Sequence, residues 1–113
     1  MADAANRVIF VAGASGGLGS AVCEVFLAAG ATVVGAARRW DAATPRRERM
    51  LTVEADLGTS FGAERALEVT FEHAGRLDGV VHLVGGFAGG KTVADTDDAT
   101  WDKMLNLNLR SAF

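Results

Sequence analysis

The feature that most constrains the fold of this chain is a glycine-rich turn, with Gly13, Gly17 and Gly19 spaced G-x-x-x-G-x-G, placed between an apolar run and a helical pattern. Residues 7–12 form the apolar run, and Gly13 ends it. An unbroken apolar run is typical of a strand that is buried on both faces, as in a parallel sheet. From Gly17 onward, apolar residues recur at spacings of three and four, which predicts an amphipathic helix that ends near Gly30. The chain therefore begins with a strand, a glycine turn and a helix.

The same signals place three more strands and two more helices along the chain. Strands are expected over residues 31–37, 50–55 and 77–84, and helices over residues 59–74 and from about residue 96 onward. Thr96 is the expected N-cap of the last helix, and Asp97 and Asp98 favour the positive end of that helix. Strands that alternate with helices at this spacing predict right-handed crossovers and a parallel α/β sheet with helices on both faces. We expect the strand order 3-2-1-4.

The glycine turn has a chemical use. Without side chains, a turn lets a pyrophosphate approach the backbone amides and the N-terminus of the following helix, where the helix dipole favours an anion. The spacing G-x-x-x-G-x-G is weak evidence alone, but its position between a buried strand and an amphipathic helix favours phosphate binding. The residues expected to bind the phosphates are Gly13, Ser15, Gly16, Gly17, Leu18 and Gly19. The alternative is a turn that is tight for structural reasons only.

The end of the second strand indicates which dinucleotide would bind. An acidic residue at that point would hold the ribose 2′-hydroxyl, but here Ala37 is followed by Arg38 and Arg39. A guanidinium binds a phosphate through two parallel hydrogen bonds, so the arginine pair favours a 2′-phosphate. NADP(H) is therefore favoured over NAD(H). The alternative is that both arginines belong to a solvated surface patch, which is the interpretation for the later arginines at 46, 47 and 49.

Composition argues against several other classes of protein. With 113 residues, half of them hydrophobic, the chain can bury the core of one compact domain. Its net charge of -3 gives no general attraction to nucleic acid or to a membrane surface. One cysteine, Cys23, excludes an internal disulfide; it is expected to pack in the core, the alternative being a reactive thiol. No leader or long apolar run is present, so a cytoplasmic location is expected, and no metal site.

Four separated motifs resemble the N-terminal half of the short-chain dehydrogenase/reductase family. They are the glycine loop, EADL at residues 54–57, GRLDGVVHLVGG at residues 75–86 and WDKMLNLNLRSAF at residues 101–113. The resemblance implies a Rossmann-type fold, cut after the third main helix, with residues 1–113 as the N-terminal half of a single dinucleotide-binding domain. The full-length protein would be a homo-oligomeric oxidoreductase that transfers hydride between NADP(H) and a carbonyl or secondary alcohol. The alternative is a non-catalytic NADP(H)-binding regulatory module.

The resemblance also implies roles for particular residues. Asp56 would bond the adenine amino group, with Leu57 beside the ring, and the segment after the fourth strand would lie along the cofactor. The implied cofactor-binding residues outside the glycine loop are Arg38, Arg39, Asp56, Leu57, Val84, Gly85 and Gly86. Asn108 would be the active-site asparagine, which organises a kinked helix and a water in the proton relay. The alternatives are an ordinary aspartate at a strand end and an asparagine that faces a neighbouring backbone.

The chain also departs from the family pattern. After the fourth strand the usual Asn-Asn-Ala-Gly is replaced by a stretch that starts with His82, which is expected to be a structural donor rather than a catalytic base. In the family a tyrosine moves the substrate proton, and a lysine four residues later lowers the pKa of that tyrosine. This chain has no tyrosine, and its two lysines, Lys91 and Lys103, come before the region of that motif. We therefore expect the 113 residues alone to be inactive.

Overall fold

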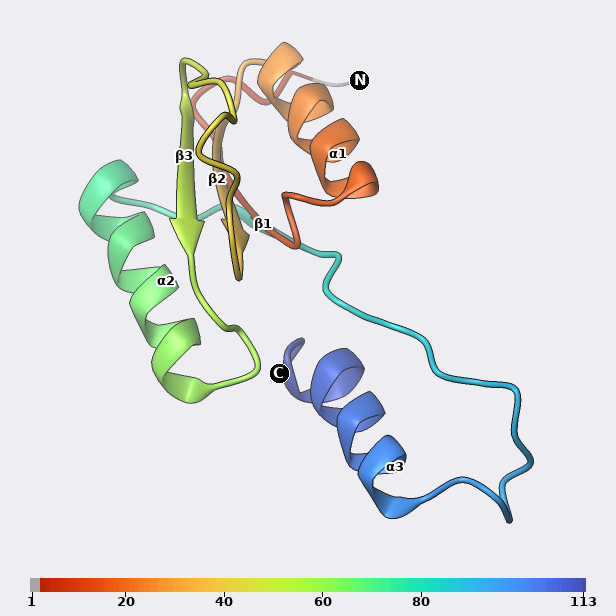
Figure 1. The fold of residues 1–113 in the computed structure, drawn as a ribbon. Coiled ribbons are helices and arrows are strands. Elements are labelled where there is room, and N and C mark those ends of the chain that lie inside the picture. Colours follow the sequence, from red (N-terminus) through yellow and green to blue (C-terminus); the bar gives the residue numbers. More distant parts are fainter. Residues whose placement is uncertain (1–2) are drawn as a thin grey trace.

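The computed structural model describes residues 3–113 and shows one parallel sheet of four strands in the order β3-β2-β1-β4. Figure 1 labels β1, β2 and β3 of this sheet. The strands are β1 (Val8–Ala12), β2 (Thr32–Ala37), β3 (Met50–Glu54) and β4 (Gly79–His82). The helices are α1 (Gly17–Ala28), α2 (Ser60–Ala74) and α3 (Asp98–Leu105), and α3 continues into a π-helical turn, η1 (Asn106–Arg110). The predicted α/β class and strand order are confirmed, although β4 is shorter at both ends than the apolar run around it.

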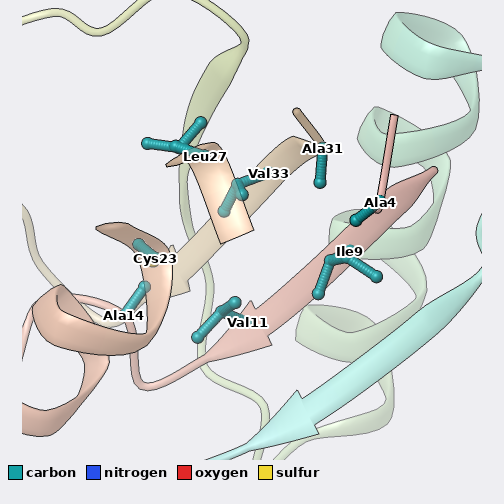
Figure 2. Close-up of a cluster of buried hydrophobic side chains, with 8 residues drawn as sticks. All are labelled: Ala4, Ile9, Val11, Ala14, Cys23, Leu27, Ala31 and Val33. Carbon is teal, nitrogen blue, oxygen red and sulfur yellow. The ribbon is translucent and has the colours of Figure 1, made fainter. Parts of the chain in front are cut away.

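Two clusters of buried side chains hold the sheet between helices on opposite faces. On one face, Ile9, Val11 and Val33 pack with Cys23 and Leu27 of α1 (Figure 2). The other face carries a second cluster, which is closed by Ala66 of α2. Every residue of β1 is buried, as the unbroken apolar run predicts for a central strand. Cys23 lies in the core as expected, and burial raises the pKa of its thiol.

The three helices differ in how their N-termini are capped. The Thr59 hydroxyl accepts a hydrogen bond from the backbone N–H of Gly62 at the start of α2. At α3 the predicted cap is wrong: Asp97, and not Thr96, is the N-cap, and its carboxylate accepts from the N–H of Thr100 at 2.8 Å. Thr96 lies one residue before the cap, and its hydroxyl donates to the carbonyl of Thr92. Hydrogen bonding by the side chain of Thr100, and then by its backbone N–H, holds the pKa of the Asp97 carboxyl below its ordinary value. At α1 no side chain caps the helix.

Because all four strands are parallel, their carboxyl ends lie at one edge of the sheet. The glycine loop follows β1 at this edge, the arginine pair follows β2, and the segments with Asp56 and Val84 follow β3 and β4. A long extended segment then leads to α3, which lies beyond the strand ends rather than against the sheet (Figure 1). Among residues 3–113, no helix has both the length and the apolar character needed to cross a membrane.

The opposite edge of the sheet supports a prediction about pH. Asp78 accepts hydrogen bonds from the backbone N–H of Val8 (2.8 Å) and from the guanidinium of Arg76. The Arg76 guanidinium, and then the Val8 N–H, hold the pKa of this carboxyl below its ordinary value. A lowered pKa stabilises the fold above about pH 4, and that contribution disappears as the pH falls through the lowered pKa.

We therefore expect Asp78→Asn to lower the midpoint of urea unfolding at pH 7, with the difference from the parent shrinking toward pH 3. Glu64→Gln is the control, because Glu64 is an exposed acid on α2. A deficit of the same size at both pH values would mean that the charge of Asp78 does not contribute.

Candidate functional site

A cleft of about 1040 Å³ opens at the carboxyl edge of the sheet, between the strand ends and the helix formed by α3 and η1. Most of the residues predicted from the sequence line it. They are Gly13, Ser15, Gly16, Arg38, Arg39, Asp56, Leu57, Val84 and Gly85. Outside its lining lie Gly17, Leu18, Gly19, Gly86 and Asn108. The structure therefore brings together segments that are up to about 70 residues apart in the sequence, as the parallel topology requires.

The glycine loop is fixed to the sheet by its own backbone. The N–H groups of Gly13 and Ala14 both donate to the carbonyl of Ala36, at 2.9 and 3.1 Å. Gly13 has a φ of 83°, a conformation that favours glycine, and a Cβ there would lie 3.0 Å from the backbone of Leu83. At Gly19 a Cβ would collide with the Gly13 carbonyl oxygen. These two glycines are required by the packing of the chain itself.

The other two glycines of the loop face open space. A Cβ on Gly17 would meet no protein atom within 4 Å, and a Cβ on Gly16 would meet only the carbonyl oxygen of Gly13, at 3.8 Å. The first turn of α1 has no side-chain cap and no acidic residue. Its N–H groups have no partner within the helix, and the dipole makes this end favourable for an anion. A pyrophosphate fits this cradle, since the chain leaves room where side chains would otherwise stand.

The cleft is positively charged although the chain as a whole is not. Its basic residues are Arg38, Arg39, Lys103 and Arg110, and Asp56 is its only acidic residue. One carboxylate oxygen of Asp56 accepts from the N–H of Gly58 at 2.9 Å. No group of three potential metal ligands occurs in the described part of the chain. The charge of the cleft is therefore suited to a ligand with several negative groups.

The basic residues on the far wall are absent from the sequence prediction. Lys103 and Arg110, with Leu107 between them, lie on one face of α3 and η1 and line the cleft. Their spacing of four and then three residues is the signal that places them on one helical face. The sequence does not reveal that this face, rather than another, meets the strand ends.

Asn108 lies behind the cleft and connects two segments of the chain. Its Oδ1 accepts from the N–H of Gly86 at 3.1 Å, and its Nδ2 donates to the carbonyls of Gly86 (3.1 Å) and Met104 (3.0 Å). It lies within the π-helical turn, at the point where the family resemblance implies a kinked helix. These bonds also agree with the alternative to a catalytic role, namely an asparagine that faces a neighbouring backbone. The catalytic role of Asn108 therefore stays a prediction.

A second bridge joins β4 to the same turn. The hydroxyl of Ser111 donates to the carbonyl of Leu107 at 2.6 Å, and Nε2 of His82 lies 3.3 Å from that hydroxyl oxygen. A serine hydroxyl has one proton to donate, so His82 must be the donor in this pair. This arrangement agrees with the structural role expected for His82.

The pairing of Asn108 with Gly86 can be tested by hydrogen exchange. We expect Asn108→Ala to speed exchange of the Gly86 amide by about tenfold, since an exposed amide that loses its acceptor opens readily to water. Asn108→Asp keeps the acceptor oxygen but sets a carboxylate oxygen against the carbonyls of Gly86 and Met104, so we expect protection of this amide between those of the parent and the alanine variant. Unchanged exchange in the alanine variant would show that the bond does not hold this segment in solution.

Comparison with known proteins identifies the family. Residues 7–113 match the family model described as short chain dehydrogenase. The chain is 34% identical to the A-factor type gamma-butyrolactone 1'-reductase of Streptomyces virginiae, a match that covers 96% of this chain and 45% of that protein. It superposes with a TM-score of 0.86 and 30% identity on the short-chain dehydrogenase/reductase SDR:Glucose/ribitol dehydrogenase of Brucella melitensis, over 100% of this chain and 50% of that one.

A further solved structure contains a nucleotide. It is the NADH-dependent reductase A1-R', complexed with NAD, which has a TM-score of 0.84 and 26% identity over 96% of this chain and 48% of that one. The chain thus spans about half the length of the relatives that it matches. Because the family model covers residues 7–113 and the fold agrees with it, this protein belongs to the short-chain dehydrogenase/reductase family.

Proposed function

We propose that the cleft binds a nicotinamide dinucleotide and prefers NADP(H) to NAD(H). The observation that carries this proposal is the open cradle at Gly16 and Gly17, located at an uncapped helix N-terminus beside a cleft with four basic side chains. Glycine at position 17 is not explained by contacts within the chain, whereas close approach of a pyrophosphate explains it. Relatives of the family with reductase and dehydrogenase names support a nicotinamide cofactor.

The proposed contacts follow the order of the strands. The amides at the start of α1, with Gly13, Ser15 and Leu18 near them, would hold the pyrophosphate. The carboxylate of Asp56 would accept from the adenine amino group, with Leu57 beside the ring. The segment of Val84, Gly85 and Gly86 would lie along the adenosine ribose.

The preference for NADP(H) depends on the residues after β2. Arg38 and Arg39 line the cleft, and the last residue of β2 is Ala37 rather than an acid. A 2′-phosphate would find two guanidinium groups there, whereas a free 2′-hydroxyl would find no carboxylate at the end of β2. The NADH-dependent neighbour shows that the same fold serves the other cofactor, so the arginine pair alone supports this preference.

For the whole protein, we propose hydride transfer between this cofactor and a carbonyl compound or secondary alcohol. Residues 1–113 would be the N-terminal half of its dinucleotide-binding domain, and Asn108 would contribute to its active site. The 113 residues contain no tyrosine, so by themselves they lack the family's proton donor. The regulatory-module alternative has no support among the relatives, whose names are those of reductases and dehydrogenases. Homo-oligomeric assembly and a cytoplasmic location stay predictions from the sequence.

Calorimetric titration of the purified chain with NADPH and with NADH tests the proposed binding. We expect saturable binding at one site per chain, with the lower dissociation constant for NADPH. Circular dichroism of the same sample shows whether the chain is folded during the titration. A folded chain that gives no binding heat and no fluorescence change with either cofactor would disprove the proposed site.

A further inference from the structure

The connection between β2 and β3 differs from the usual crossover. Parallel neighbours are normally joined through a helix that covers one face of the sheet. Here residues 38–49 join the two strands, and none of them is helical. This segment carries Arg38 and Arg39, so its position decides where these two side chains stand in the cleft. The contacts that hold this connection against the sheet therefore determine where the two guanidinium groups lie.

Trp40 covers the face that a crossover helix would otherwise cover. Its half-buried ring packs against the cluster between the sheet and α1. A Cβ on Gly35 of β2 would lie 3.3 Å from Cζ2 of this ring, so the absence of a side chain at Gly35 makes room for it. The indole Nε1 donates to the carbonyl of Val53 at 3.1 Å. The ring is thus fixed to β2 by packing and to β3 by a hydrogen bond.

Glu54 holds the backbone of the same residue. Its Oε1 accepts from the backbone N–H of Trp40 at 3.1 Å. Glu54 is the last residue of β3, and in the sheet register it is the partner of Ala37, the last residue of β2. The chain is therefore held in the sheet at Ala37 and held again at Trp40. Only Arg38 and Arg39 lie between these two points.

We propose that Trp40 and Glu54 form a clamp that positions Arg38 and Arg39 and thereby sets the preference for a phosphorylated ribose. This inference depends on the proposed function, and both clamp residues act through the arginines rather than on the cofactor. Neither Trp40 nor Glu54 lines the cleft. If only the negative charge of Glu54 mattered, it would repel the 2′-phosphate near the arginines, and removing this charge should strengthen NADPH binding. The clamp predicts the opposite result.

The test compares NADPH and NADH binding among four variants of the chain. Trp40→Phe keeps a ring over Gly35 but loses the indole donor, and Glu54→Ala removes the acceptor. Each is expected to weaken NADPH binding about fivefold, the change that loss of one hydrogen bond produces, with NADH affinity kept within about twofold. Glu54→Gln retains an acceptor oxygen and should keep the parent's preference for NADPH. Glu48→Ala is the control, because it removes an exposed negative charge from the same connection.

Each outcome decides the matter. Equal losses for NADPH and NADH would overturn the clamp and leave Trp40 and Glu54 with a general stabilising role. Unchanged NADPH binding in both Trp40→Phe and Glu54→Ala would also overturn it, while the proposed function would stand if Arg38→Asp still weakened NADPH binding. A parent chain that binds both cofactors equally would disprove the proposed preference and the clamp together. Glu54 is exposed, so its variants keep the test valid if Trp40→Phe does not fold.

Discussion

Gly19→Ala is expected to lower the free energy of unfolding by about 3 kcal/mol, the upper part of the range for an added group in a close-packed site. The new Cβ would collide with the carbonyl oxygen of Gly13 and lie 2.7 Å from Cα of Ala14. Both are backbone atoms of the loop that is bonded to Ala36, so they cannot move aside without loosening the loop. Alanine favours a helix over glycine by about 1 kcal/mol, which is too little to offset the collision. Urea unfolding followed by circular dichroism measures the change.

Gly17→Ala is the matched variant, with the same substitution two residues earlier in the same helix. Its Cβ would enter open space, so we expect the stability of the chain to be unchanged or slightly higher. NADPH affinity should nevertheless fall about tenfold, because a methyl group would stand where the pyrophosphate is proposed to approach. A Gly17→Ala variant that is as unstable as Gly19→Ala, or that binds NADPH as well as the parent, would contradict the cradle.

This pair of glycines also shows where sequence reasoning stops. The two residues have the same chemistry in one motif, and the sequence predicts both as parts of a phosphate loop. Only the spatial arrangement separates Gly19, which the backbone of Gly13 crowds, from Gly17, which nothing in the chain crowds. The distinction depends on a contact between turn and helix that neither spacing nor periodicity contains.

The sheet could be predicted because its signals are local. The first strand is apolar at every position, so it had to be central, and each helix pattern between strands required a crossover. The start of α3 was mispredicted because two adjacent residues, Thr96 and Asp97, both belong to the types that cap helices. The choice depends on where the backbone turns helical: Asp97 is still extended and Asp98 is the first helical residue, which a list of residue types does not specify.

The site was only partly predictable for a related reason. Residues within two positions of a strand end, such as Arg38 and Asp56, must lie at the carboxyl edge, so the order of strands is enough to place them. The positions of Lys103 and Arg110 depend on how α3 is oriented toward that edge. The positions of the clamp residues, Trp40 and Glu54, depend on the path of a connection that has no regular structure. Such positions are set by contacts between distant segments, which a pattern along the chain does not record.

The preference between cofactors is expected to depend most strongly on Arg38. Arg38→Asp should weaken NADPH binding at least about tenfold, because a charge-assisted hydrogen bond contributes about 1.5–3 kcal/mol and the new carboxylate would repel the 2′-phosphate. The same carboxylate can accept a hydrogen bond from a free 2′-hydroxyl, so NADH affinity should stay the same or rise. Calorimetry with each cofactor measures the two constants.

The matched control is Arg46→Asp, which makes the same change of charge in the same connection at a residue outside the cleft lining. Both variants would reduce the long-range attraction between the chain and an anionic ligand by the same amount. Added salt would screen this long-range contribution to the affinity. Only a specific contact with the 2′-phosphate separates Arg38 from Arg46 and NADPH from NADH at the same time. If Arg38→Asp lowers the affinity for both cofactors equally, Arg38 does not recognise the phosphorylated ribose, and the cleft selects a dinucleotide without selecting its phosphate.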